Sequence, residues 1–122
     1  MLVKGRLSRA LVFWKDIHAL QFILDVIEFG YKLPLLQIPT PFTARNNSSA
    51  LEQSAFVENA INDLIRQGCV TEVFGQPIII NPLSASIQKS GKKRLILDLC
   101  HVNQFLYKKK FRCEDLHVAK RF

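Results

Sequence analysis

The sequence has few cysteines, no long apolar run and few acidic residues in its last third. Its three cysteines, Cys69, Cys100 and Cys113, lie far apart and form no C-x-x-C pair, so we expect neither a disulfide framework nor a zinc ribbon. No stretch approaches the roughly 18 uninterrupted apolar residues of a membrane span, and the apolar stretch 10–14 is too short for a signal-peptide core. We therefore expect an intracellular protein of the cytoplasm or nucleus, without a signal peptide or membrane contact.

Metal-binding side chains are also sparse. Cys100, His101, Cys113 and His117 are the one group that invites a metal-site interpretation. Their spacing fits no common structural zinc pattern, so we expect no metal site.

The shortage of acids is confined to the C-terminal part. Residues 1–88 hold seven bases and seven acids, whereas residues 89–122 hold ten bases and three acids, so the net charge of +7 lies in the latter segment. A basic block of this kind favours polyanions such as a nucleic-acid backbone or a triphosphate, although a solvated edge would carry the same charge. Lys108, Lys109 and Lys110 are candidates for contact with the backbone.

The chain of 122 residues, 48% of them apolar, suits one modest domain. Apolar residues recur at helical spacing over 9–29, and Gly30 follows, which predicts one amphipathic helix. Residues 31–48 contain three prolines and suit an extended linker. The expected organisation is an N-terminal helical extension (1–30), a linker (31–48) and a body (49–122).

The body is expected to begin with a helix. Ser49-Ala50-Leu51-Glu52 has the capping-box pattern, and a single apolar stripe runs from there to Gly68.

Residues 83–99 predict a β-hairpin, followed by a short turn or helix over 100–106. A three-residue loop, Ser90-Gly91-Lys92, collects the apolar side chains on one face, whereas a two-residue loop pairing Ile87 with Arg94 mixes the faces. The preferred register pairs Ile87 with Leu95, Ala85 with Leu97 and Leu83 with Leu99. It buries Leu97 and leaves Arg94 and Asp98 on the outer face.

The hairpin reads Lys89-x-Gly91-x-x-Arg94-x-x-x-Asp98-x-Cys100-x-Val102-Asn103. This resembles the fingers motif K-x-G-x-x-R-x-x-x-D-[YFL]-R-x-[LV]-N of retroviral and gypsy-like reverse transcriptases. The Gly68-Cys69-Val70 step and the Asn81-Pro82-Leu83 entry are similar to the family's at matching distances. Residues 110–116 and 30–34 look most like the tyrosine-recombinase (DIRS-like) branch, and the resemblance covers roughly residues 50 to 116.

The resemblance implies an α+β fold and places the hairpin over the incoming nucleotide. It makes Arg94 the best triphosphate ligand, because a guanidinium fork matches phosphate oxygens in a bidentate way. Lys89 is the second candidate, although strict alternation puts it on the face opposite Arg94. Gly91, Asp98 and Asn103 are expected to support the hairpin, and Cys100 stands where the family has an arginine.

The family's chemistry also needs an Asp-Asp pair, because carboxylates must hold two divalent metals, and this sequence has none. We therefore expect a truncated fragment of a retrotransposon RNA-directed DNA polymerase, inactive alone. Mg²⁺ belongs to a complete family member and no cofactor to this fragment. The implied partners are RNA template, DNA primer, deoxynucleotide and the missing palm. A free-standing basic nucleic-acid-binding module and a helical protein-interaction domain with a basic tail are the alternatives.

Overall fold

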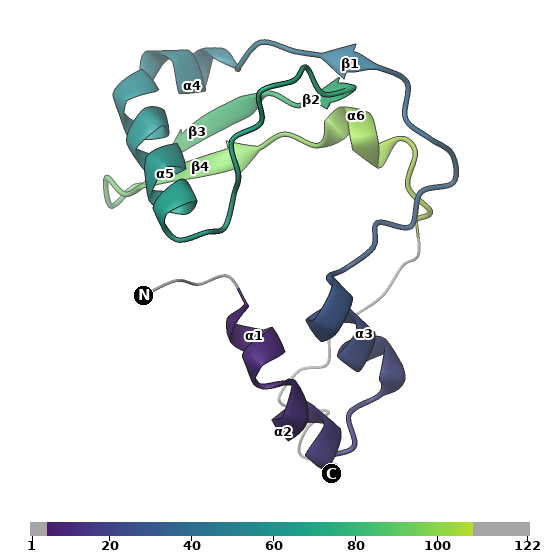
Figure 1. Cartoon of the computed structure of the whole chain (residues 1–122). Coiled ribbons are helices and arrows are strands. Elements are labelled where there is room, and N and C mark those ends of the chain that lie inside the picture. The colour runs from purple at the N-terminus through teal and green to yellow at the C-terminus, as the bar shows by residue number, and fades with distance from the viewer. Residues whose placement is uncertain (1–4, 109–122) are drawn as a thin grey trace.

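The computed structural model describes residues 5–108 as an α+β chain (Figure 1). An N-terminal lobe contains α1 (Arg6–Arg9), α2 (Leu11–Asp16) and α3 (Gln21–Phe29). The body contains β1 (Phe42–Thr43), α4 (Ser48–Glu52), α5 (Ser54–Arg66), β2 (Ile79–Ile80), β3 (Leu83–Ile87), β4 (Lys93–Leu97) and α6 (Cys100–Asn103). Among these residues, no helix has the length and apolar character needed to cross a membrane.

The expectation of one helix over 9–29 is wrong, because the segment forms parts of three helices. His18 has a φ of +55°, which a right-handed helix cannot accommodate. Its N–H bonds to the Lys15 carbonyl (3.0 Å) and the Ala19 N–H to the Trp14 carbonyl (3.1 Å), the pattern of a Schellman C-cap. The backbone therefore ends α2 although the apolar spacing continues. Gly30 ends α3 as expected.

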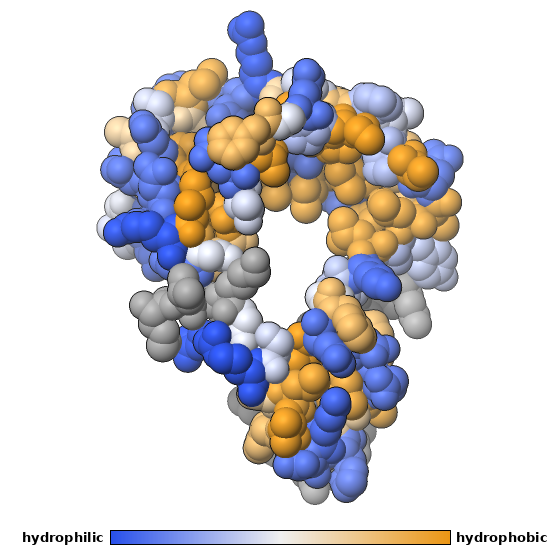
Figure 2. All heavy atoms as spheres, in the orientation of Figure 1, coloured by the Kyte–Doolittle hydropathy of each residue, from blue (hydrophilic) through white to orange (hydrophobic). Residues whose placement is uncertain are grey.

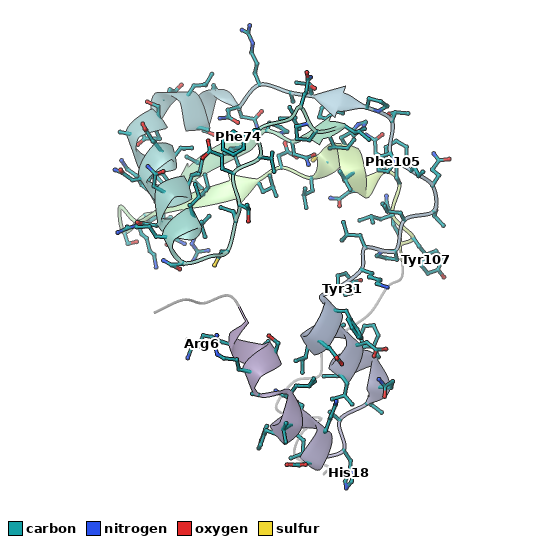
Figure 3. All side chains as sticks on the ribbon, viewed as in Figure 1. Arg6, His18, Tyr31, Phe74, Phe105 and Tyr107 are labelled. Carbon is teal, nitrogen blue, oxygen red and sulfur yellow. The ribbon has the colours of Figure 1, made fainter. Side chains whose placement is uncertain are left out.

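Residues 31–47 lack regular structure except for β1, and they run along the body. Phe42 and Thr43 pair in parallel with Ile79 and Ile80. Nearer the lobe, the Tyr107 N–H donates to the Pro34 carbonyl at 2.8 Å, and Figure 3 shows Tyr107 beside this segment. The predicted division into extension, linker and body stays a prediction.

The first body helix differs from its expected form. It begins at Ser48 as α4, makes no side-chain cap bond and gives way at Gln53 to α5. The capping box is therefore wrong, because Ser49 Oγ accepts the Ala85 backbone N–H at 3.2 Å instead. The expected end of this helix at Gly68 is confirmed, since Gly68 has a φ of +71° and its N–H donates to the Ile65 carbonyl.

The β3–β4 hairpin is confirmed, but its expected register is wrong. The loop is Lys89-Ser90-Gly91, one residue earlier than expected, and it is closed by the Gln88 N–H bonding to the Lys92 carbonyl at 2.8 Å. The ladder pairs Leu83 with Leu97, Ser84 with Ile96, Ala85 with Leu95, Ser86 with Arg94 and Ile87 with Lys93. Because the shift is two residues, every side chain keeps its expected face.

The two edges of this hairpin differ. The N–H groups of Leu83 and Ala85 point away from β4, toward Asn46 Oδ1 and Ser49 Oγ. Antiparallel strands alternate their bonding direction, so Lys93, Leu95 and Leu97 turn their backbone groups away from β3. The structure describes no strand on that side of β4 within residues 5–108.

Little of the apolar surface is buried. Among the described residues, only Ala50, Val57, Pro82 and Val102 are buried. The apolar hairpin face and α5 line an open cavity of about 670 Å³ with Phe56, Leu64, Val70, Leu83, Leu95 and Leu97 among its walls. The expectation that Leu97 is buried is therefore wrong, because 55% of it is exposed. Figure 2 shows hydrophobic residues reaching the surface in both the lobe and the body.

Candidate nucleic-acid interface

The hairpin turn depends on Gly91. It has a φ of +81°, a region that side chains with a Cβ rarely adopt, and its N–H donates to the Gln88 carbonyl at 2.8 Å. This turn holds the exposed Lys89 at the end of the arm, and Figure 1 shows the turn extending past α5.

Arg94 lies on the outer face of β4, opposite Ser86. With the Gln88 amide turned so that its oxygen faces the guanidinium, Gln88 Oε1 accepts hydrogen bonds from Arg94 Nη2 (3.1 Å) and Nε (3.2 Å). Arg94 is exposed and contacts no carboxylate, since the only ion pair within residues 5–108 joins Arg66 and Asp63. Its guanidinium therefore keeps donors available for an anion.

Lys89 and Arg94 do not contact each other in the part of the chain that the structure describes. The neighbour of Lys89, Gln88, is the residue that reaches Arg94. Lys93, between the turn and Arg94, instead points to the apolar face, where its Nζ lies 6.0 Å from the centre of the Phe56 ring. The basic side chains at the end of the hairpin thus point to both of its faces, Arg94 to the outer face and Lys93 to the apolar face.

Asp98 links the base of the hairpin to α6. Its backbone N–H donates to the Pro82 carbonyl and its Oδ1 accepts the Cys100 N–H, each at 2.9 Å. The Cys100 thiol, followed by the Cys100 backbone N–H and the Asn47 amide, holds the pKa of Asp98 below its ordinary value. The Asp98 carboxylate in turn raises the pKa of Cys100, through a hydrogen bond and then through its charge. Sequence reasoning noted Cys100 as a missing arginine and did not identify this pair.

The other predicted support residue, Asn103, has an exposed side chain that makes no hydrogen bond within residues 5–108. Its backbone N–H donates to the carbonyl of Leu99, the residue just before α6. Three lysines were expected to contact the nucleic-acid backbone. Of these, Lys108 is exposed, while Lys109 and Lys110 lie outside the described residues.

The His101 side chain packs against neighbouring aromatic rings. Its ring stacks on Phe42 with centroids 4.1 Å apart, meets Phe105 edge-on at 5.3 Å, and its Nε2 lies 3.0 Å from the Thr40 carbonyl oxygen. Residues 5–108 contain no group of three side chains able to hold a metal. Cys113 and His117 lie outside the described residues.

The candidate interface is thus a projecting hairpin with exposed cations at its turn and on its outer face. Comparison of the chain with protein-family models, with curated proteins and with solved structures found no match.

Proposed function

We propose that this chain is the fingers region of a retroelement reverse transcriptase and that its β3–β4 hairpin contacts the phosphates of nucleic acid or of an incoming deoxynucleotide. The observation that carries the proposal is the charge of this arm. Residues 84–97 contain Lys89, Lys92, Lys93 and Arg94 and no acid. Such a cluster attracts polyanions, because each neutralised phosphate releases condensed counterions.

Arg94 is the residue best suited to the phosphate. Its guanidinium is exposed and is oriented by Gln88 from the side of the turn. A guanidinium held in this way loses less conformational entropy when it forms a fork with two phosphate oxygens. Gly91 contributes indirectly, because its left-handed conformation sets the turn that positions Gln88.

Salt-dependent binding tests the contact. The affinity of the full chain for a labelled single-stranded RNA should fall with salt, and Arg94→Ala should reduce the slope of log K against log salt by about 0.7, the value of one single-strand phosphate contact. Arg45→Ala is the matched control, because Arg45 is also exposed but lies outside the hairpin. An equal reduction in both variants, or no salt dependence, would contradict the hairpin's role.

Two further measurements are needed. One distinguishes the phosphates of RNA from those of a deoxynucleoside triphosphate, and the other tests the assignment to a reverse-transcriptase fragment. Displacement of the RNA by a deoxynucleoside triphosphate, lost in Arg94→Ala, would point to the triphosphate. The chain alone should extend no primer with Mg²⁺ or Mn²⁺, because it contains no Asp-Asp pair to hold two metals. Template-directed incorporation would overturn the assignment to a fragment without the catalytic carboxylates.

A further inference from the structure

Helix α3 carries apolar side chains on two faces. Leu24 and Ile27, which belong to the apolar residues at helical spacing over 9–29, are partly buried in the lobe. Phe22 and Phe29 lie elsewhere on the helix and are 62% and 69% exposed. Together with Asp25 and Val26 they are spaced i, i+3, i+4 and i+7, so they share one helical face.

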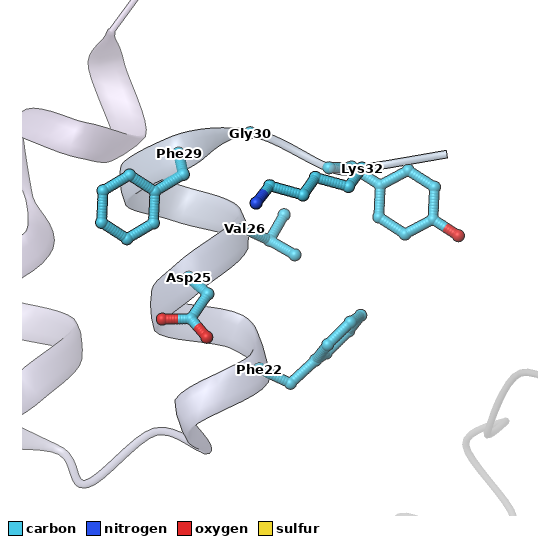
Figure 4. Close-up of a pocket in the computed structure, with 7 residues that line it drawn as sticks. Phe22, Asp25, Val26, Phe29, Gly30 and Lys32 are labelled. Atoms are coloured by element: carbon cyan, nitrogen blue, oxygen red, sulfur yellow. The ribbon is translucent and has the colours of Figure 1, made fainter. Parts of the chain in front are cut away.

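The end of the helix completes a pocket on this face. Gly30 has a φ of +85° and its N–H closes the last turn on the Val26 carbonyl. The turn brings Tyr31 and Lys32 back to the same side, where they line a cavity of about 380 Å³ with Phe22, Asp25, Val26 and Phe29. Figure 4 shows Phe22 and Phe29 on opposite sides of this pocket, with the Lys32 side chain folded back above Val26.

The two charged groups in the pocket remain available. Asp25 Oδ1 accepts a hydrogen bond from Gln21 Nε2 at 2.8 Å, and a carboxylate has further acceptor sites on both oxygens. Asp25 and Lys32 form no ion pair with each other or with another residue in the described range. The walls of the cavity therefore offer a ligand a carboxylate, an ammonium and aromatic rings.

We infer that this pocket binds a guanine base. Unpaired bases stack on aromatic side chains and are read by hydrogen bonds to their edges. Guanine presents two adjacent donors, N1–H and the N2 amino group, which match the two oxygens of Asp25, beside the acceptor O6, which matches the Lys32 ammonium. Adenine and cytosine offer one amino donor beside a ring-nitrogen acceptor, and uracil offers one N–H between two carbonyls, so none of them can donate to a carboxylate in a bidentate way. The site is separate from the hairpin and adds base recognition to it.

The base can come from a free nucleotide or from a single strand, and two titrations of the full chain distinguish these sources. One compares guanosine monophosphate with adenosine monophosphate. The other compares short uridine strands that carry one central guanine or one central adenine. A preference for guanine in either titration supports the site, and its presence in the strand alone assigns the source to nucleic acid. Equal affinity for the two bases in both titrations overturns the inference.

Variants locate the preference. Asp25→Asn should reduce the preference for guanine over adenine by about tenfold or more, because hydrogen bonds to a charged acceptor are lost. Asp16→Asn is the matched control, since Asp16 is an exposed carboxylate on α2. Phe22→Ala should weaken guanine binding by about fivefold or more through lost stacking, whereas Phe13→Ala, which removes a ring that is 58% exposed on α2, should leave it unchanged.

Circular dichroism should show unchanged helix content in all four variants, because each substituted residue is largely exposed. A control that reduces the preference as much as its partner variant would contradict the assignment to this pocket. Base preference for free nucleotides and the salt slope of strand binding are separate readouts, so the guanine site and the hairpin contact can each fail alone.

Discussion

Leu97 lies directly opposite Leu83 in the β3–β4 ladder and is 55% exposed, although it belongs to the apolar face. Val57 in α5 is only 6% exposed. We expect Leu97→Ala to cost about 1 kcal/mol or less, because most of its surface stays in water, and Val57→Ala to cost about 2 to 3 kcal/mol through lost burial and a cavity. Urea denaturation of both variants gives the comparison. A cost of roughly 2 to 5 kcal/mol for Leu97→Ala, typical of a core leucine, would mean that this face is covered in solution.

Gly91→Ala should destabilise the hairpin. Nothing lies within 4 Å of an added Cβ at this position, so steric contact is not the cause, but the φ of +81° is unfavourable for alanine. The expected cost is about 1 to 2 kcal/mol. Gly75→Ala is the control, because Gly75 also has open space around it and no positive φ, and it should be neutral or stabilising by up to about 1 kcal/mol. Equal urea midpoints for the two variants would argue against the left-handed turn.

The reactivity of Cys100 should depend on Asp98. The carboxylate raises the pKa of this thiol, and only the thiolate is nucleophilic. Asp98→Asn should therefore accelerate alkylation of Cys100 by iodoacetamide at mildly alkaline pH. Peptide mass spectrometry reads the rate, and Cys69, on the exposed segment after α5, serves as the internal standard. A slower or unchanged Cys100 rate relative to Cys69 would contradict the contact.

Asp98 should also contribute to stability in a pH-dependent way. Because its folded pKa is lowered, its stabilising contribution is present above the unfolded value of about 3.9 and is lost as pH falls through the lower folded value. Asp98→Asn should therefore be less stable than wild type at neutral pH, and the difference should shrink as the pH falls below about 4. Urea midpoints across an acidic series measure this. If the stability difference between wild type and Asp98→Asn grew as the pH fell, a lowered pKa of Asp98 in the folded state would be contradicted.

The sequence predicted the faces of the hairpin better than its register. Alternation determines only whether a residue points in or out, so Arg94 was placed on the outer face correctly, while the loop position depends on where a left-handed residue fits. The expected register placed Gln88 on the outer face beside Arg94. In the observed ladder Arg94 pairs with Ser86, and Gln88 still reaches Arg94 diagonally. The expected roles of Arg94 and Lys89 in phosphate binding stay predictions.

The helices illustrate a different limit. Apolar spacing over 9–29 contains no sign that His18 adopts a positive φ, so it predicted one helix where the backbone forms several. Ser49 matched a capping pattern, but its hydroxyl is used by β3, a partner 36 residues away. The aromatic face of α3 was overlooked, because a single stripe through Leu24 and Ile27 already accounted for the helix.

The unequal edges of the hairpin limit how copies of this chain can associate through it. Asn46 and Ser49 accept the backbone N–H groups of Leu83 and Ala85 along β3, whereas the backbone groups of Lys93, Leu95 and Leu97 along β4 face outward. Open-ended stacking of strands requires two free edges on every sheet. Within the described residues, β4 is the edge on which a further strand, such as β4 of a second copy, can pair without displacing these contacts. The side-chain contacts at Leu83 and Ala85 therefore oppose the addition of a strand on the β3 side of the hairpin.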